Sequence, residues 1–306
     1  MIVLKPVNVK LGNVDTSAVK TGGELRKALS QSLKLNENRI RLTSTSAEGE
    51  KPTVISDKDE LAQFGHGGET KVTVKDLGPQ LGWRTVYLIE YFGPILIHVI
   101  LYNFPSVVYG SPVAHTSLQR HFFYANLFHY IKRELETLFV HRFSLGTMPA
   151  RNVFKNSFHY WILGGLIPAF CVYAPQAWED AHPVLFGRNM MKRSDEKQAI
   201  SWLVWAFCQS SNFNAHMILR DLRPTGSTKR GIPFGFGFSY VSCPNYFFES
   251  MGWLVMTIIV SNWSLLLFWV VGTVQMSIWA VQKHRRYRRE FPDYPRDRKA
   301  IFPLLL

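Results

Sequence analysis

Amide, imidazole and guanidinium side chains gather at the end of an uncharged stretch, residues 198–219. Asn212 and His216 are four residues apart and share one helical face, which Arg220 extends by another turn. Amides and imidazole can bind a sugar and a base, and paired arginines can bind phosphate, so the cluster suits a dinucleotide. Arginines at a membrane edge can also serve only to set topology. The cluster consists of Asn212, Asn214, His216, Arg220, Asp221 and Arg223.

Two other segments place ionisable side chains inside apolar sequence, where such groups are costly and usually face the protein interior. Glu90 lies about one turn into an apolar stretch and either orients a substrate or anchors helix packing. In residues 126–145, Lys132 and Glu136 are four apart and can form an ion pair. That segment is expected either to bind anionic phosphates or to be an internally paired interfacial helix.

A phenol stands at the mouth of a further apolar segment. Tyr246 is flanked by Asn245 and Glu249, and such a group can donate a proton to a developing enolate. An interfacial tyrosine with no catalytic role is the alternative interpretation. Gly235 and Gly237 precede it but do not form a GxGxxG motif, so the sequence excludes a Rossmann nucleotide site.

Long apolar stretches predict that the chain from residue 85 onward lies in a membrane, because about 20 apolar residues cross a bilayer. The longest uncharged stretch, residues 251–281, is either one long tilted span or two segments that bend near Asn262 or Gly272. A break is expected at Gly93-Pro94 in the first span, and residues 231–248 are expected to be re-entrant or interfacial. We expect about four to seven crossings, with six as the central prediction. The other candidate spans are residues 85–108, 122–139, 157–178 and 198–219.

The formal charge of +13 does not indicate nucleic-acid binding, because the basic residues lie mostly in short loops and beside apolar spans. This is the positive-inside pattern, and the basic run that begins at Lys283 predicts a cytosolic C-terminus. Residues 1–10 lack the apolar core of a signal peptide, so a cytosolic N-terminus is expected as well. The three cysteines are widely spaced with no CxxC pair, which supports neither a disulfide framework nor a metal site.

Residues 1–76 are charged and Gly-rich and have short β-like alternations at residues 1–9, 39–42 and 71–74. Residues 24–35 have helical spacing. The expected order of strand, strand, helix, strand, strand suggests a ubiquitin-like β-grasp domain, acting either as a docking module or as a folding cap. Residues 77–84 are the predicted linker, and residues 85–306 are the predicted membrane domain with a basic cytosolic C-terminal tail.

Several motifs occur in one order along the chain and together resemble the very-long-chain trans-2-enoyl-CoA reductases of the steroid 5α-reductase-like superfamily. The resemblance covers nearly the whole chain. The motifs are Tyr87-Leu-Ile-Glu90-Tyr91-Phe-Gly-Pro94, Lys132-Arg-Glu-Leu-Glu136 with Val140-His141-Arg142-Phe143-Ser144, Asn214-Ala-His216-xx-Leu219-Arg220-x-Leu222-Arg223, and Ser242-Cys-Pro-Asn-Tyr246-Phe-Phe-Glu249.

The resemblance implies reduction of the C2=C3 bond of a trans-2-enoyl-CoA with NADPH, the last step of the fatty-acid elongation cycle. It also implies a multi-pass protein of the endoplasmic reticulum membrane that works with other elongation enzymes. Tyr246 becomes the expected proton or oxyanion donor, with Glu90 and Lys132 as supports. Either Arg220 or Arg223 is expected to read the 2′-phosphate of NADPH. The expected cofactor-side residues are Asn214, His216, Arg220, Arg223 and Glu249.

Three alternatives remain open at this stage. A reductase of a steroid or polyprenol double bond would use the same chemistry. A transporter would line a pathway with Glu90, Asn212 and His216, although these groups cluster toward one face and no inverted repeat is visible. A non-catalytic scaffold would use residues 1–76 to recruit partners to a lipid-enzyme assembly.

Overall fold

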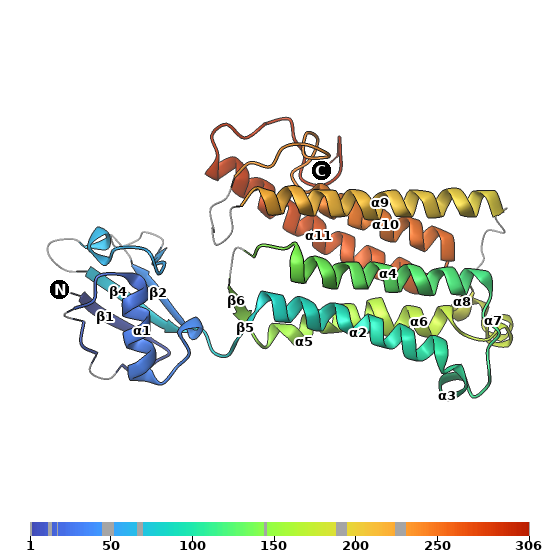
Figure 1. The fold of residues 1–306 in the computed structure, drawn as a ribbon, viewed down its shortest axis with the longest axis horizontal. Coiled ribbons are helices and arrows are strands. Elements are labelled where there is room, and N and C mark those ends of the chain that lie inside the picture. The colour runs from blue at the N-terminus through green and yellow to red at the C-terminus, as the bar shows by residue number, and fades with distance from the viewer. Residues whose placement is uncertain are drawn as a thin grey trace. The chain divides into compact units, whose positions relative to one another are not determined.

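The computed structural model describes residues 2–11, 14–16, 18–44, 52–65, 70–143, 146–187, 195–223 and 231–305. The chain divides into two compact units (Figure 1). The first unit consists of Met1–Trp83 with Leu145–Val153, and the second of Arg84–Ser144 with Phe154–Leu306.

The first unit contains a mixed four-stranded sheet with the spatial order β1-β4-β2-β3. The outer strand β1 (Ile2–Val7) pairs in parallel with β4 (Thr70–Asp76). The strand β2 (Ile40–Ser44) is antiparallel to β4 and to the two-residue β3 (Thr53–Val54). Short 3-10 turns cover Glu37–Arg39 and Leu61–Phe64.

The helix α1 (Gly22–Leu33) packs against this sheet and closes the core of the first unit. A capping box starts the helix, because Thr21 accepts from the Glu24 backbone N–H while the Glu24 carboxylate accepts from that of Thr21. Leu25 and Leu29, one turn apart, are fully buried against the sheet. The core consists of Leu25, Leu29, Ile40, Leu42, Ile55, Leu61, Val72 and Val74.

The strands expected near residues 1–9, 39–42 and 71–74 and the helix expected at residues 24–35 all form, with shifted ends. A second strand before the helix does not form in the described residues 8–11, 14–16 and 18–20. Residues 80–82, inside the predicted linker, instead form β5 (Gln80–Gly82), which pairs antiparallel with β6 (Thr147–Pro149).

The second unit is helical (Figure 1). In it α10 packs against α9, α11 and α4. Its longer helices are α2 (Trp83–Asn103), α4 (Ser117–Phe139), α9 (Asp195–Asp221), α10 (Pro244–Val260) and α11 (Trp263–Glu290). Its shorter segments are α3 (Pro105–Tyr109), α5 (Asn152–Ser157), the π-helical η3 (Phe158–Leu166), α6 (Ile167–Val172), α7 (Gln176–Ala181) and α8 (Pro183–Phe186).

The break expected at Gly93-Pro94 is wrong, because α2 continues through both residues. Proline removes one helical hydrogen bond, but packing against η3 supports this turn. The Trp161 indole on η3 donates to the Ile89 carbonyl at 2.9 Å, about one turn before Gly93. A Cβ at Gly93 would lie 2.1 Å from the indole nitrogen, so only glycine allows this close approach.

The uncharged residues 251–281 form parts of two helices and not one long span. The turn between α10 and α11 is at Ser261, whose φ is 54°. Asn262 then caps α11 by accepting from the Ser264 backbone N–H at 3.0 Å. The bend near Asn262 is therefore the correct alternative.

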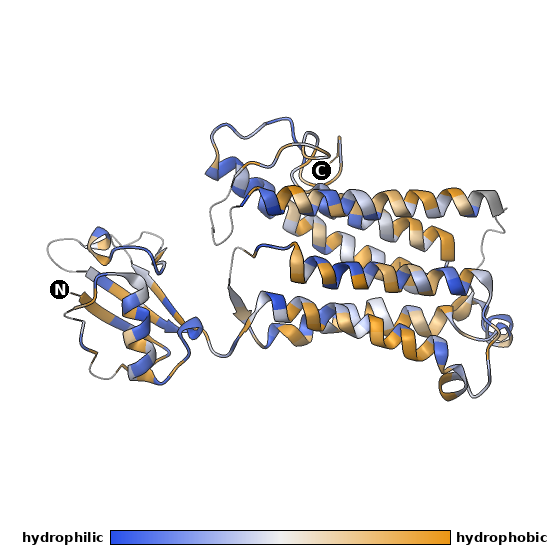
Figure 2. Cartoon of the chain, in the orientation of Figure 1, coloured by the Kyte–Doolittle hydropathy of each residue, from blue (hydrophilic) through white to orange (hydrophobic). Residues whose placement is uncertain are grey.

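Two of the described helices, α2 and α11, are long and apolar enough to cross a membrane. On α2 the exposed Phe92, Leu96 and Ile100 are spaced by four residues and form an outward apolar stripe. Figure 2 shows apolar residues along most of the helices of this unit and hydrophilic residues at the end of α11. These features indicate membrane association.

Candidate functional site

A buried row of charged side chains on α4 faces α9. The Lys132 ammonium donates to Asn212 Oδ1 at 2.7 Å and lies 3.1 Å from Glu136 Oε1. The other Glu136 oxygen lies 3.1 Å from His216 Nδ1 and also accepts from Arg133. The Glu136 side chain is only 2% exposed, so one carboxylate neutralises two cations inside the protein.

Arg133 connects this row to α2. Its guanidinium donates to the Tyr91 hydroxyl at 2.9 Å and lies 5.0 Å from the centre of that ring. A second nitrogen of the guanidinium lies 3.2 Å from His216 Nδ1. Although ligand atoms of Glu136, His141 and His216 lie within 4.8 Å of one another, Arg133 already supplies the cation there. The group is better explained as an ion-pair network than as a metal site.

His141 follows α4 and meets His216 edge to face, with ring centres 4.9 Å apart. Burial and the nearby Arg133 charge hold the pKa of His141 well below its usual range. The imidazole is therefore neutral at physiological pH and can both donate and accept a hydrogen bond.

A second buried network joins α4, α9 and α10. His129 Nε2 lies 3.3 Å from Glu249 Oε1, and its Nδ1 lies 3.1 Å from Gln209 Oε1. Trp253 donates to the same Glu249 oxygen at 3.1 Å. The network fixes the three helices against one another.

The first network reaches a cavity of about 240 Å³, which Arg133 and His216 help to line together with residues from the ends of α9 and α11 and the start of α10. Five cationic side chains and four aromatic rings line it, and such groups suit phosphates and flat rings respectively. The cavity brings together side chains that are far apart in the sequence. Its lining is Tyr87, Arg133, His141, Arg142, Phe143, His216, Leu219, Arg220, Leu222, Arg223, Gly231, Asn245, Tyr246, Lys283 and Tyr287.

The arginines of the cavity hold the ends of α4 and α9 together. Arg142 donates to the Arg220 carbonyl at 3.1 Å and to the Arg223 carbonyl. Arg223 donates back to the Arg142 carbonyl at 3.0 Å. Arg220 forms a 2.8 Å pair with the exposed Asp221. These contacts place three guanidinium groups at one end of the helical unit.

Lys283 lies on the α11 side of the cavity. Its ammonium is 5.9 Å from the ring centre of Tyr246 and 5.9 Å from that of Tyr287. Tyr246 itself is half-buried in the first turn of α10. The phenol expected to do chemistry therefore faces a cationic cavity.

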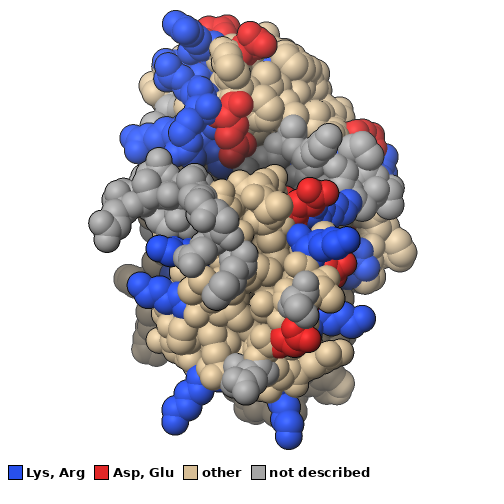
Figure 3. Space-filling model, turned by 90° about the vertical axis from the view of Figure 1, so that its left-hand side faces the viewer, with Lys and Arg blue, Asp and Glu red and all other residues tan. Residues whose placement is uncertain are grey.

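Further basic residues follow Lys283 along the last turns of α11. Arg285, Arg288 and Arg289 are exposed, and the last two lie in the final turn of the helix. Figure 3 shows Lys and Arg side chains gathered over the upper part of one face, where Figure 1 places this end of α11. The cavity therefore lies at the strongly basic end of the helical unit, which favours anionic ligands.

Four of the eight residues predicted for the site line the cavity: Tyr246, His216, Arg220 and Arg223. Lys132 and Glu249 do not line it and belong to the two buried networks. The predicted site residues did not include Arg133, Arg142 or Lys283, although phosphate binding was one expectation for residues 126–145, which contain both arginines. Sequence reasoning assigned Lys283 only to topology, because a basic residue after an apolar span fits that role equally well.

Glu90 and Asn214 are not brought to the cavity. Glu90 is 2% exposed within α2, and its Oε1 has no hydrogen-bond partner among the described residues. Asn214 is exposed on α9 and lies outside the cavity lining, so its cofactor-side role stays a prediction. Two residues along a helix turn the side chain by about 200°, so Asn214 points away from the face that carries Asn212 and His216.

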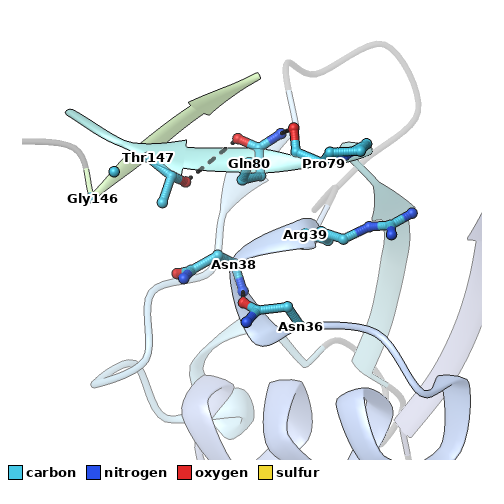
Figure 4. A pocket seen from close by; sticks show the side chains of 8 residues that line it. Asn36, Asn38, Arg39, Pro79, Gln80, Gly146 and Thr147 are labelled. Atoms are coloured by element: carbon cyan, nitrogen blue, oxygen red, sulfur yellow. Dashed lines mark hydrogen bonds between the residues drawn. The ribbon is translucent and has the colours of Figure 1, made fainter. Parts of the chain in front are cut away.

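A second pocket, of about 550 Å³, lies in the first unit between the turn at Asn36–Arg39 and the β5-β6 pair (Figure 4). Several polar side chains in it form hydrogen bonds with other residues of the first unit. The Arg39 guanidinium donates two hydrogen bonds to the Asp76 carboxylate, at 3.0 and 2.6 Å. These bonds lower the pKa of the Asp76 carboxyl group. Gln80 accepts from the Thr147 hydroxyl at 3.4 Å. This pocket is less suited to chemistry than the cavity of the second unit.

Comparison with known proteins identifies relatives over most of the chain. A family described as 3-oxo-5-alpha-steroid 4-dehydrogenase matches residues 146–306. A Schizosaccharomyces pombe protein whose name includes enoyl reductase is 43% identical over 92% of this chain and 90% of its own length. The very-long-chain enoyl-CoA reductase of Dictyostelium discoideum is 37% identical over 97% of this chain and 96% of its own. The trans-2,3-enoyl-CoA reductase-like protein of Mus musculus is 34% identical over 76% of this chain and 63% of its own length.

Proposed function

Because the chain belongs to the very-long-chain enoyl-CoA reductase family, we propose that it reduces the C2=C3 bond of trans-2-enoyl-CoA with NADPH. The reaction is the last step of the fatty-acid elongation cycle. The observation that carries the proposal is the cavity in which Tyr246 faces His216, Lys283 and a group of arginines.

The donor set of the cavity fits a nicotinamide dinucleotide. Guanidinium and ammonium groups can bind the phosphates, and the rings of Tyr87, Phe143 and Tyr287 offer surfaces for its flat groups. Arg220 or Arg223 reads the 2′-phosphate, which distinguishes NADPH from NADH. His216 binds on the cofactor side, and Glu249 supports that side through its contacts to His129 and Trp253. The bound cofactor supplies the hydride, which adds to C3 of the substrate.

Tyr246 completes the reduction. Negative charge develops on the thioester oxygen as C3 receives the hydride, and the Tyr246 hydroxyl donates a hydrogen bond to that oxygen or a proton to C2. The ammonium of Lys283, 5.9 Å from the Tyr246 ring, stabilises the phenolate that proton donation leaves. The product gains one hydride and one proton, so the two electrons are accounted for.

Lys132 positions Tyr246 from a distance. It binds Asn212 Oδ1, and the Asn212 amide donates to the Asn245 carbonyl at 2.9 Å. Asn245 directly precedes Tyr246, so this chain of contacts fixes the first turn of α10. Glu90, whose carboxyl group is buried in α2, is proposed to support the site by orienting the substrate.

The acyl chain requires an apolar environment. We propose that about six helices of residues 85–306 cross the membrane and hold the chain between them, at roughly 0.8 kcal/mol per buried methylene. The basic end of the helical unit then lies on the cytosolic side of the endoplasmic reticulum membrane, with both termini in the cytosol. There the charged CoA and the cofactor can enter from water.

Residues 1–76 are proposed to be a ubiquitin-like β-grasp domain. The parallel β1-β4 pair, the helix that packs on the sheet and the β2-β3 edge support that assignment. Its proposed role is docking to other elongation enzymes, with residues 77–84 as the link to the membrane domain.

Turnover by the purified protein tests the proposed function. We expect reduction of an enoyl-CoA with a chain of about 18 carbons and a clear preference for NADPH over NADH. Tyr246→Phe is expected to lower kcat by about 100-fold or more, since general acids contribute about 10²–10⁴. Tyr240→Phe, a change at a tyrosine that is 70% exposed, is the matched control and keeps wild-type turnover.

The outcomes separate the alternatives. Near-normal turnover by Tyr246→Phe removes this residue from the chemistry. Reduction of a steroid double bond with no turnover of enoyl-CoA would assign the protein to the related reaction named by the matching family.

A further inference from the structure

Residues 291–305 follow α11 and pack against the loop that leads into α10. Lys299 accepts from the Ser242 backbone N–H at 2.8 Å and donates to the Tyr240 carbonyl at 3.0 Å. Ala300 accepts from the Cys243 backbone N–H at 3.1 Å. The segment expected as a basic tail therefore pairs, in a parallel bridge, with the residues just before Tyr246.

Two hydrogen bonds made by the Ser242 hydroxyl fix this pairing. The Ser242 hydroxyl lies 2.6 Å from the Tyr294 hydroxyl and 2.6 Å from His284 Nδ1. Tyr294 is 3% exposed, and its ring stacks on Tyr287 with centres 5.3 Å apart. Tyr287 lines the cavity. The Ser242 hydroxyl thus joins the loop before α10, the last turns of α11 and the C-terminal segment.

Apolar side chains also pack between the C-terminal segment, α11 and the start of α10. Cys243 and Ile301 are fully buried and pack with Ala280 of α11. Phe302 meets Phe247 edge to face, with ring centres 6.1 Å apart. Phe247 lies in the first turn of α10.

The start of α10 depends on these contacts because it has no side-chain cap. Cys243 is the N-cap residue, and its carbonyl accepts from the Tyr246 backbone N–H at 3.1 Å. The backbone N–H of Cys243 donates to the Ala300 carbonyl. Ala300, Cys243 and Tyr246 therefore form a continuous hydrogen-bonded path from the C-terminal segment to the phenol.

We propose that the segment from Tyr294 to Ile301 is a positioning element for Tyr246, acting through the shared hydroxyl contact of Tyr294 and Ser242. The inference rests on the proposed reductase function. Tyr294 is not among the residues that line the cavity. It holds the first turn of α10, which carries Tyr246, against the end of α11, which carries Lys283.

A double-mutant cycle on the purified full-length protein tests this role. Tyr294→Phe keeps the stacked ring and removes one hydroxyl, and Ser242→Ala removes its partner. Each is expected to lower kcat for enoyl-CoA with NADPH about fivefold, which corresponds to one buried hydrogen bond of about 1 kcal/mol. The KM for enoyl-CoA should change less than about twofold, because substrate binding is unaffected.

The double variant should resemble Ser242→Ala alone, since both changes delete one shared contact. Ser242→Thr retains a hydroxyl and should restore kcat, and Tyr240→Phe is the exposed control. Thermal unfolding gives the folded fraction of each variant at the assay temperature, and kcat is calculated per folded protein.

Wild-type kcat in both single variants, or losses that multiply in the double variant, would overturn the positioning role while wild-type turnover stands. A loss explained entirely by the unfolded fraction would also overturn it. Absence of enoyl-CoA turnover in the wild-type protein would instead refute the proposed function and, with it, this inference.

Discussion

Glu136→Gln should destabilise the helical unit strongly. The Glu136 carboxylate contacts Lys132, Arg133 and His216, with the lysine and histidine contacts both at 3.1 Å. Glutamine has nearly the same shape but no charge, so the change leaves two buried cations without their shared counter-charge. Breaking a buried ion pair from one side costs about 3–5 kcal/mol.

Thermal unfolding in detergent measures this effect. For a domain of this size, about 1 kcal/mol lowers Tm by roughly 2–4 °C, so Glu136→Gln should lower Tm by roughly 6–20 °C. Glu134→Gln is the matched control, because it makes the same chemical change on a different face of α4. A Tm for Glu136→Gln within about 2 °C of the wild type would refute the view that this carboxylate neutralises the buried cations.

Two further predictions concern packing and pH. Gly93→Ala places a Cβ 2.1 Å from the Trp161 indole nitrogen and should cost about 1–3 kcal/mol, seen as a lower Tm, whereas Gly146→Ala has open space within 4 Å and should keep the wild-type Tm. The lowered pKa of His141 means that the unfolded chain binds a proton there below about pH 6.5 while the folded protein does not. Acidification from pH 7 to 5 should therefore remove about 2 kcal/mol of stability at this residue. The Tm of His141→Asn should therefore fall less than that of the wild type between pH 7 and pH 5. If both proteins lose Tm equally over that range, His141 is not the neutral buried imidazole that its lowered pKa implies.

The buried charges of α4 have a functional consequence. Ionic groups inside a protein are expensive, and replacing them with apolar residues often stabilises a fold. Here Lys132, Arg133 and Glu136 belong to the buried network on α4, and Arg133 lines the cavity together with Tyr246. Their contacts with Asn212 and His216 hold α4 against α9, and Arg133 adds a positive charge to the cavity wall.

The sequence by itself determined the helical segments and the kinds of side chain available for chemistry. Long uncharged stretches have few ways to satisfy their backbone except as helices, so helical segments within α2, α9, α10 and α11 followed from composition. Four-residue spacing also placed Asn212, His216 and Arg220 on one face.

The tertiary structure decided which faces meet. Asn212 and Asn214 are indistinguishable by type, and only the rotation of α9 buries one and exposes the other. Lys283 looks like a topology signal until α11 brings its ammonium to 5.9 Å from the Tyr246 ring. The physical reason is that a helix is a local structure fixed by nearby residues, whereas a cavity depends on contacts between segments far apart in the chain.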